Sequence, residues 1–172
     1  MNNLSHIAML AEIFSALAIV LGAGYAAVQY FAFRTLRRDQ AAAELCRRFS
    51  EPDLARAVIQ LFRLPDGLPA EEFRKQGQEY EEAAQIVGVT FETMGLLVYR
   101  DIASFTLVQE MSGGLLQALW RKMGPWVHGV REETGNPRFG EWVQWLAERL
   151  QEREEEIEPA FAAHRDWSHY NS

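Results

Sequence analysis

The chain has 172 residues, enough for one compact domain and a short additional segment but not for two domains. Its net charge is −7 and no basic stripe interleaves with aromatic residues, which argues against duplex nucleic acid as a partner. The single cysteine, Cys46, excludes an internal disulfide framework and is typical of a reducing compartment.

The N-terminal segment is apolar. The first 33 residues hold one acidic residue, Glu12, and no Lys or Arg, whereas all 17 basic residues follow them. Between Ile13 and Val28 only Ser15 is polar, and about 20 helical residues cross a hydrocarbon core. We therefore predict a transmembrane anchor in residues 1–33, in contact with the lipid bilayer. A cleaved signal peptide is the alternative, but it would carry positive charge before the apolar run.

Three arginines set the predicted orientation. Arg34, Arg37 and Arg38 follow the span directly, and the positive-inside rule places that side in the cytoplasm. The reducing environment expected for Cys46 agrees with this placement. The N-terminus is therefore expected outside and the C-terminal part in the cytoplasm.

The predicted span has one side of small residues. Small residues let two membrane helices approach closely, and the chain shows no second span, so a partner helix would come from another molecule. An anchor that faces lipid on all sides is the alternative. At about 100° per residue the small side comprises Ala11, Ser15, Ala18, Gly22, Ala26 and Gln29.

Glu12 borders this small side, about a turn inside the apolar run. A carboxylate is costly at mid-bilayer and cheaper near the interface. Two interpretations stay open: an interfacial residue in the first turn, or a ring of Glu12 side chains within an oligomer.

The polar part is expected to be helical throughout. Residues 34–49 should continue the first helix, residues 50–158 should form a cytoplasmic domain, and residues 159–172 should be loosely held. No convincing period-two strand appears, so the predicted fold class is all-α, a single N-terminal transmembrane helix continuing into a helical bundle.

Helix boundaries follow from caps and breakers. Ser50 as N-cap and Pro52 in the first turn start a second helix, which ends before a turn cluster at 64–69. Further helices are predicted at 70–100, from 104 to 112–114, at 115–134 with a kink or break at Pro125, and at 139–156, the last burying Trp142, Trp145, Leu146 and Leu150.

Motifs for catalysis or cofactors are weak. Gly113–Gly114 fits no phosphate-binding fingerprint, and Cys46 is interpreted as a structural thiol. The tail carries three residues that could bind a metal, which are too few for a metal cage, namely His164, Asp166 and His169. We therefore expect no metal, no cofactor and no enzymatic activity.

One pair of residues supplies an enzymatic alternative. Arg121 and His128 are separated by six residues, which resembles the R-x4-6-H signature of HEPN ribonucleases. That resemblance would imply a dimeric, membrane-tethered ribonuclease in which the pair polarises the phosphate and moves protons. Such a pair is also expected by chance in this composition, and Gly124 and Pro125 should interrupt the helix that presents it.

A further pattern of residues comprises Glu92, Gly95, Leu96, Tyr99, Arg100, Trp120, Pro125 and the segment Thr134–Phe139. With this pattern the chain resembles a bacterial family of uncharacterised single-span proteins with a helical cytoplasmic domain of unknown function. This resemblance implies the bacterial inner membrane but no activity.

In layout and size the chain also resembles the membrane accessory proteins of type VI CRISPR systems, which would imply a pore-forming phage-defence effector. The leading hypothesis is a non-enzymatic inner-membrane homo-oligomer, with a pore or defence role as its most concrete form. The alternatives are the ribonuclease and an adaptor that binds an unidentified cytosolic protein on the acidic helix after Glu148.

Overall fold

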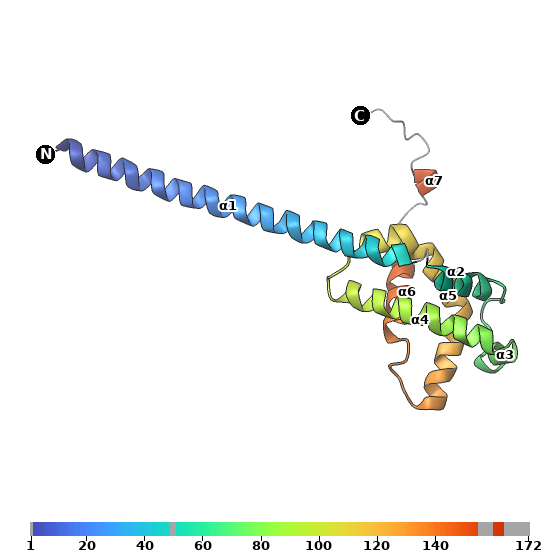
Figure 1. Ribbon diagram of the computed structural model, residues 1–172. Helices are drawn as coiled ribbons and strands as arrows, with labels where there is room; N and C mark the ends of the chain where they lie inside the picture. The colour runs from blue at the N-terminus through green and yellow to red at the C-terminus, as the bar shows by residue number, and fades with distance from the viewer. Residues whose placement is uncertain (1, 49–50, 155–159, 164–172) are drawn as a thin grey trace.

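The computed structural model describes residues 2–48, 51–154 and 160–163, and these contain helices and no strand. The all-α prediction is confirmed. A long N-terminal helix, α1, stands clear of a bundle of shorter helices (Figure 1). The elements are α1 (Asn2–Arg47), α2 (Pro52–Phe62), α3 (Ala70–Lys75), α4 (Gln78–Tyr99), α5 (Phe105–Thr134), α6 (Glu141–Glu154) and α7 (Ala160–Ala163).

Helix α1 runs for 46 residues without a break. Its segment Phe14–Arg47 is long and apolar enough to cross a membrane, with a mean hydropathy of 1.7 in the most apolar window and none of that window buried. Only the last turns enter the bundle, where Ala42, Leu45 and Cys46 join the core beside α5. The predicted continuation of the span into the domain is confirmed.

Helix α2 begins as the sequence indicates, with Pro52 at its first position. Glu51 occupies the N-cap position without a side-chain cap, and the predicted cap Ser50 lies outside the described residues. Leu54, Ala57 and Leu61 are buried against α4 and α5.

The predicted helix at 70–100 is wrong, because the structure divides it into α3 and α4. The division falls at Gly77, whose φ of +127° is a conformation that glycine adopts readily and other residues rarely do. This corner turns α3 across the end of α4, so that Phe73 enters the core.

The predicted division of α5 near Gly113 and Gly114 is also wrong, and the helix is not broken at Pro125. Gly113 is buried within α5, and an added Cβ there would lie at an ordinary contact distance of 3.5 Å from Leu150 of α6. Pro125 cannot donate to the carbonyl of Arg121, and that carbonyl instead accepts from the backbone N–H of Gly67 at 2.8 Å. The α2–α3 loop therefore replaces the missing hydrogen bond and the helix continues.

Helix α6 begins at Glu141, two residues later than predicted, because Phe139 and Gly140 belong to the preceding turn. Leu146 and Leu150 are buried as predicted, together with Val143 and Ala147. Trp142 and Trp145 are only partly buried, because both pack against Tyr99 at the edge of the bundle. The predicted end at Glu156 lies outside the described residues, as does most of the tail.

Two glycines of α4 test the packing of α6. A Cβ at Gly95 would lie 2.3 Å from the backbone oxygen of Trp142, whereas one at Gly88 would lie 3.5 Å from the flexible end of Met123. Gly95→Ala should therefore lower the unfolding free energy by about 1–3 kcal/mol through overpacking. Gly88→Ala should raise it by about 0.5–1 kcal/mol through helix propensity.

Denaturant unfolding of the detergent-solubilised protein, followed by far-UV circular dichroism, measures both changes. Equal effects of the two substitutions would contradict the close contact between α4 and α6.

Candidate functional site

A pocket of about 520 Å³ lies between α4, α5 and the α5–α6 turn. Its size and mostly apolar lining are typical of small-molecule sites. Three polar residues join the lining, namely Gln85, Glu92 and Arg138. The apolar lining comprises Ala84, Gly88, Val89, Met123, Trp126, Val127, Phe139, Gly140 and Val143.

The turn from α5 to α6 forms one wall of the pocket. Gly135 ends α5 in the left-handed conformation, with φ +64°, and the Asn136 side chain accepts from the Arg138 N–H at 3.1 Å. Arg131 donates to the carbonyls of Phe139 at 2.7 Å and Gly140 at 3.1 Å. The segment Thr134–Phe139 therefore forms a hydrogen-bonded turn that directs the chain into α6.

Glu92 connects the pocket to the start of α6. Its Oε2 accepts from the backbone N–H groups of Trp142 at 3.0 Å and Val143 at 2.9 Å. These N–H groups lie in the first turn of α6, where a helix offers them no acceptor of its own, so Glu92 of α4 caps the N-terminus of α6. The absence of a side chain at Gly95 permits this approach.

The pKa of Glu92 is raised above its ordinary value. Burial of the carboxyl group is the main cause, and the two backbone donors of Val143 and Trp142 oppose it. The charge of Glu141 acts in the same direction as burial, and that of Arg131 opposes it.

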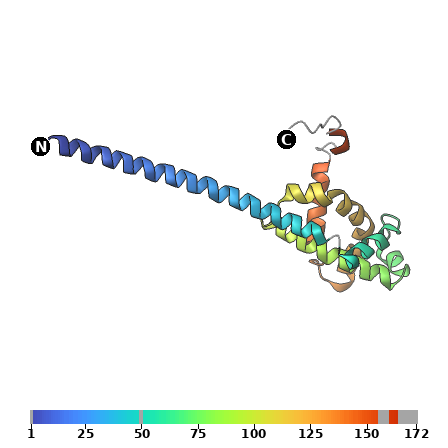
Figure 2. The same cartoon turned by 45° about the horizontal axis from the view of Figure 1, so that its top comes forward.

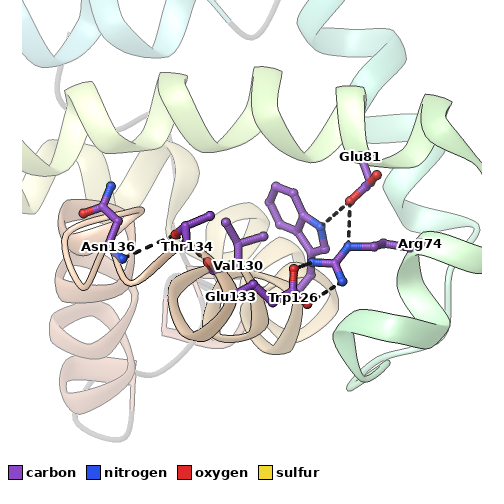
Figure 3. A network of polar contacts seen from close by, with 7 residues as sticks. All are labelled: Arg74, Glu81, Trp126, Val130, Glu133, Thr134 and Asn136. Atoms are coloured by element: carbon purple, nitrogen blue, oxygen red, sulfur yellow. Dashed lines mark hydrogen bonds and ion pairs between the residues drawn. The ribbon is translucent and has the colours of Figure 1, made fainter.

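Trp126, which lines the pocket, belongs to a network of polar contacts that Figure 3 shows. The indole N–H of Trp126 donates to Glu81 at 3.0 Å, and Glu81 also pairs with Arg74 at 3.3 Å. Arg74 in turn makes two hydrogen bonds of 2.5 Å to Glu133. Because Arg74 lies on α3, this network fixes α3, α4 and α5 around the Trp126 ring.

The lining of the pocket contains one carboxyl group, that of Glu92, and no His, Cys or Ser. The side chain of Arg138 is exposed and forms no hydrogen bond or ion pair within the described part of the chain. Among the described residues no group of three or more His, Cys, Asp or Glu is placed to hold a metal.

Residues 13–150 match a family described as a domain of unknown function (DUF4760). The chain belongs to this family. The match includes most of the long apolar helix as well as the bundle, so the pocket and the helix are parts of one family unit. The predicted membership of an uncharacterised family is confirmed.

Comparison with curated proteins and with solved structures gives no match. It provides no link to the membrane accessory proteins of type VI CRISPR systems.

Several residues that carried the predicted family resemblance lie around this pocket or its turn. Glu92 caps α6, Gly95 makes room for it, and Tyr99 packs on Trp142. The sequence pattern assigned no role to these residues, because the contact between α4 and α6 joins positions 50 residues apart.

Arg121 and His128 lie on one continuous helix, α5, so the expected interruption is wrong. Their spacing places them on one side of that helix, about two turns apart. Arg121 donates to Asp66 at 3.1 Å, and neighbouring Lys122 donates to Asp66 at 2.8 Å and to the carbonyl of Leu64 at 2.7 Å. Arg121 thus helps to hold the α2–α3 loop on α5. His128 is exposed and lies edge-on to Trp120.

The small side of the span makes no contact with the bundle. The described side chains at Ser15, Ala18, Ala26 and Gln29 are exposed, and a Cβ at Gly22 would meet nothing within 4 Å. Ala11 lies outside the described side chains. Glu12 is exposed near the N-terminal end of the helix.

The arginines after the span have partners that the sequence did not reveal. Asp101, in the α4–α5 loop, accepts from Arg34 at 2.7 Å and from Arg38 at 2.5 Å. Arg37 instead lies over the Phe33 ring, 4.6 Å from its centroid. Asp101 has φ +59°, a left-handed conformation that Asp tolerates better than most residues.

The Glu92 cap predicts a loss of stability on substitution. Glu92→Ala leaves two backbone donors of α6 without their acceptor, so the unfolding free energy should fall by about 1–2 kcal/mol. Glu92→Gln keeps an acceptor oxygen and should cost less. Denaturant unfolding of the detergent-solubilised variants at neutral pH measures the difference.

The raised pKa of Glu92 adds a pH dependence. The folded state binds the Glu92 proton more tightly than the unfolded state, so protonation of Glu92 raises the free energy of unfolding. This contribution is complete below the pKa of Glu92 in the unfolded state, and it is lost as pH rises through the pKa in the folded state. Glu92→Gln removes this dependence of stability on pH, because glutamine does not titrate. The wild type should therefore gain stability relative to Glu92→Gln as pH falls from 7 towards 4.5, the ordinary pKa of a glutamate side chain. An unchanged difference across that range would contradict the burial of an ionisable group.

Proposed function

We propose that the protein is a non-enzymatic, single-pass protein of the bacterial inner membrane that self-associates through α1. The observation that carries this proposal is the exposure of α1. Every described side chain from Met9 to Arg37 is exposed, including Phe14 at 75% and Val20 at 67%. The apolar part of α1 before Arg34 is not covered by the bundle, so it requires another apolar environment, which a bilayer supplies.

The orientation follows from charge. Arg34, Arg37 and Arg38 stand at one end of the apolar run, and residues 1–33 carry no Lys or Arg. The positive-inside rule then supports an outer N-terminus and a cytoplasmic bundle.

Self-association is supported by the small side of α1. Gly22 and Ala18 lie on the side that also carries Ser15 and Ala26, and no residue of the bundle covers it. Small residues at such spacing permit close packing of membrane helices, and in this chain the partner would be a second copy. A pore bordered by Glu12 is the most concrete form of this assembly.

The non-enzymatic character is supported by the contacts of Arg121. The ribonuclease alternative requires this guanidinium at a phosphate, whereas it is paired with Asp66. The pocket at Glu92 likewise has the composition of a binding site.

Two glycines of α1 give a matched test of self-association. Gly22 lies on the small side and Gly24 on the opposite side, and a Cβ added at either position would meet nothing within 4 Å. Gly22→Leu should abolish the assembly because it blocks close packing, whereas Gly24→Leu should preserve it. The measurement is the protein mass of the full-length, detergent-solubilised chain by light scattering, with the detergent subtracted.

A discrete assembly of the wild type that only Gly22→Leu dissociates supports the proposal. A monomeric wild type, or equal effects of the two substitutions, would reject packing through the small side.

A further inference from the structure

If α1 spans the membrane as proposed, the contacts of the α4–α5 loop (residues 100–104) with α1 fix the position of that loop relative to the bilayer. Arg34 is the first residue after the apolar run, and Arg38 lies about 7.5 Å beyond Phe33 along the helix. Asp101 binds both arginines, and the backbone N–H of Ser104 donates to the Arg38 carbonyl at 3.2 Å. The headgroup layer is about 5–8 Å thick on each side, so these contacts place the loop within it.

Both views of the ribbon agree with this placement. In Figures 1 and 2 the loop between α4 and α5 is the part of the bundle that reaches furthest towards the N-terminal end of α1. Helix α2 lies on the other side of the bundle in the same views. The bundle therefore presents one defined edge to the membrane.

Two side chains at this edge expose large apolar surfaces. Tyr99 is 56% exposed and Ile102 is 50% exposed, although both lie beside a well-packed core. The Tyr99 ring is held against Trp142, with ring centroids 4.7 Å apart, and against Trp145 at 5.6 Å. Aromatic rings that combine an apolar body with a polar group are favoured at the membrane interface.

The charge at this edge is opposite to that of the whole chain. Arg100 is exposed, and its side chain forms no hydrogen bond or ion pair within the described residues. Together with Arg34, Arg37 and Arg38 it gives this edge four cations against two acids, Asp39 and Asp101, in a chain of net charge −7. Anionic headgroups attract such a cluster and repel the acidic remainder.

We propose that the α4–α5 loop is a second membrane contact, which docks into the anionic headgroup layer of the bilayer that α1 spans. Ile102 and Tyr99 lie at the boundary with the acyl chains, and Arg100 pairs with a lipid phosphate. This inference rests on the proposed membrane span of α1.

Site-directed spin labels on the full-length protein test the depth of the loop. In a Cys46→Ala background, nitroxides are attached at Ile102→Cys, at Ile59→Cys on α2 as a control of similar exposure (57%), and at Val20→Cys within the span. The protein is reconstituted in vesicles of phosphatidylethanolamine and phosphatidylglycerol. Power saturation then compares collisions with oxygen, which concentrates in lipid, and with a water-soluble nickel chelate.

The ratio of oxygen to nickel accessibility at position 102 should shift from that of position 59 towards that of position 20. Arg100→Gln should lower the ratio of docked to undocked loops about fivefold, because one cation near an anionic membrane surface changes this equilibrium by about that factor. A position-102 label that matches position 59 while position 20 is lipid-exposed would overturn the docking and leave the span intact. A water-exposed label at position 20 would overturn the span, and the docking with it.

Discussion

The attachment of the bundle to α1 through Asp101 is the interaction on which the arrangement of the molecule depends. One carboxylate accepts from Arg34 and Arg38, one helical turn apart, and the adjacent backbone of Ser104 donates to the carbonyl of Arg38. An exposed ion pair alone contributes little to stability. Here it acts with the burial of Ala42, Leu45 and Cys46, so that α1 enters the bundle in one direction.

The consequences of this attachment extend along α4. Asp101 follows the C-terminal end of α4, Gly95 and Glu92 lie within about three turns before it, and Glu92 caps α6. The middle of α4 therefore lines the pocket, and the loop that follows α4 pairs with α1 through Asp101. A ligand in the pocket would contact the helix whose following loop is paired with these arginines.

The sequence predicts the helices better than the contacts between them. The apolar run and the first-turn Pro52 are local signals, and each led to a correct helix. Pro125 is also a local signal, yet it does not break α5, because the carbonyl that it leaves free is satisfied by Gly67, 54 residues before Arg121 in the chain. Periodicity contains no information on such a long-range partner.

The candidate site was less predictable for the same reason. Glu92 and Asp101 are single acidic residues among 24, and only the folded chain shows which backbone or guanidinium each one meets. Trp142 and Trp145 were expected in the core on hydrophobicity, whereas their contact with Tyr99 keeps them at the edge. For Asp101 the sequence contained one signal, which was its position directly after the predicted end of a helix at residue 100.

The most direct test of this attachment is the distance between α1 and the bundle in vesicles, measured by double electron–electron resonance. Labels at Tyr25→Cys and Val89→Cys, both exposed, report this distance in a Cys46→Ala background. A fixed attachment predicts one narrow distribution, which broadens when Asp101→Ala removes both ion pairs. A broad distribution in the protein with Asp101 intact would show that the span and the bundle move independently, and would contradict the attachment.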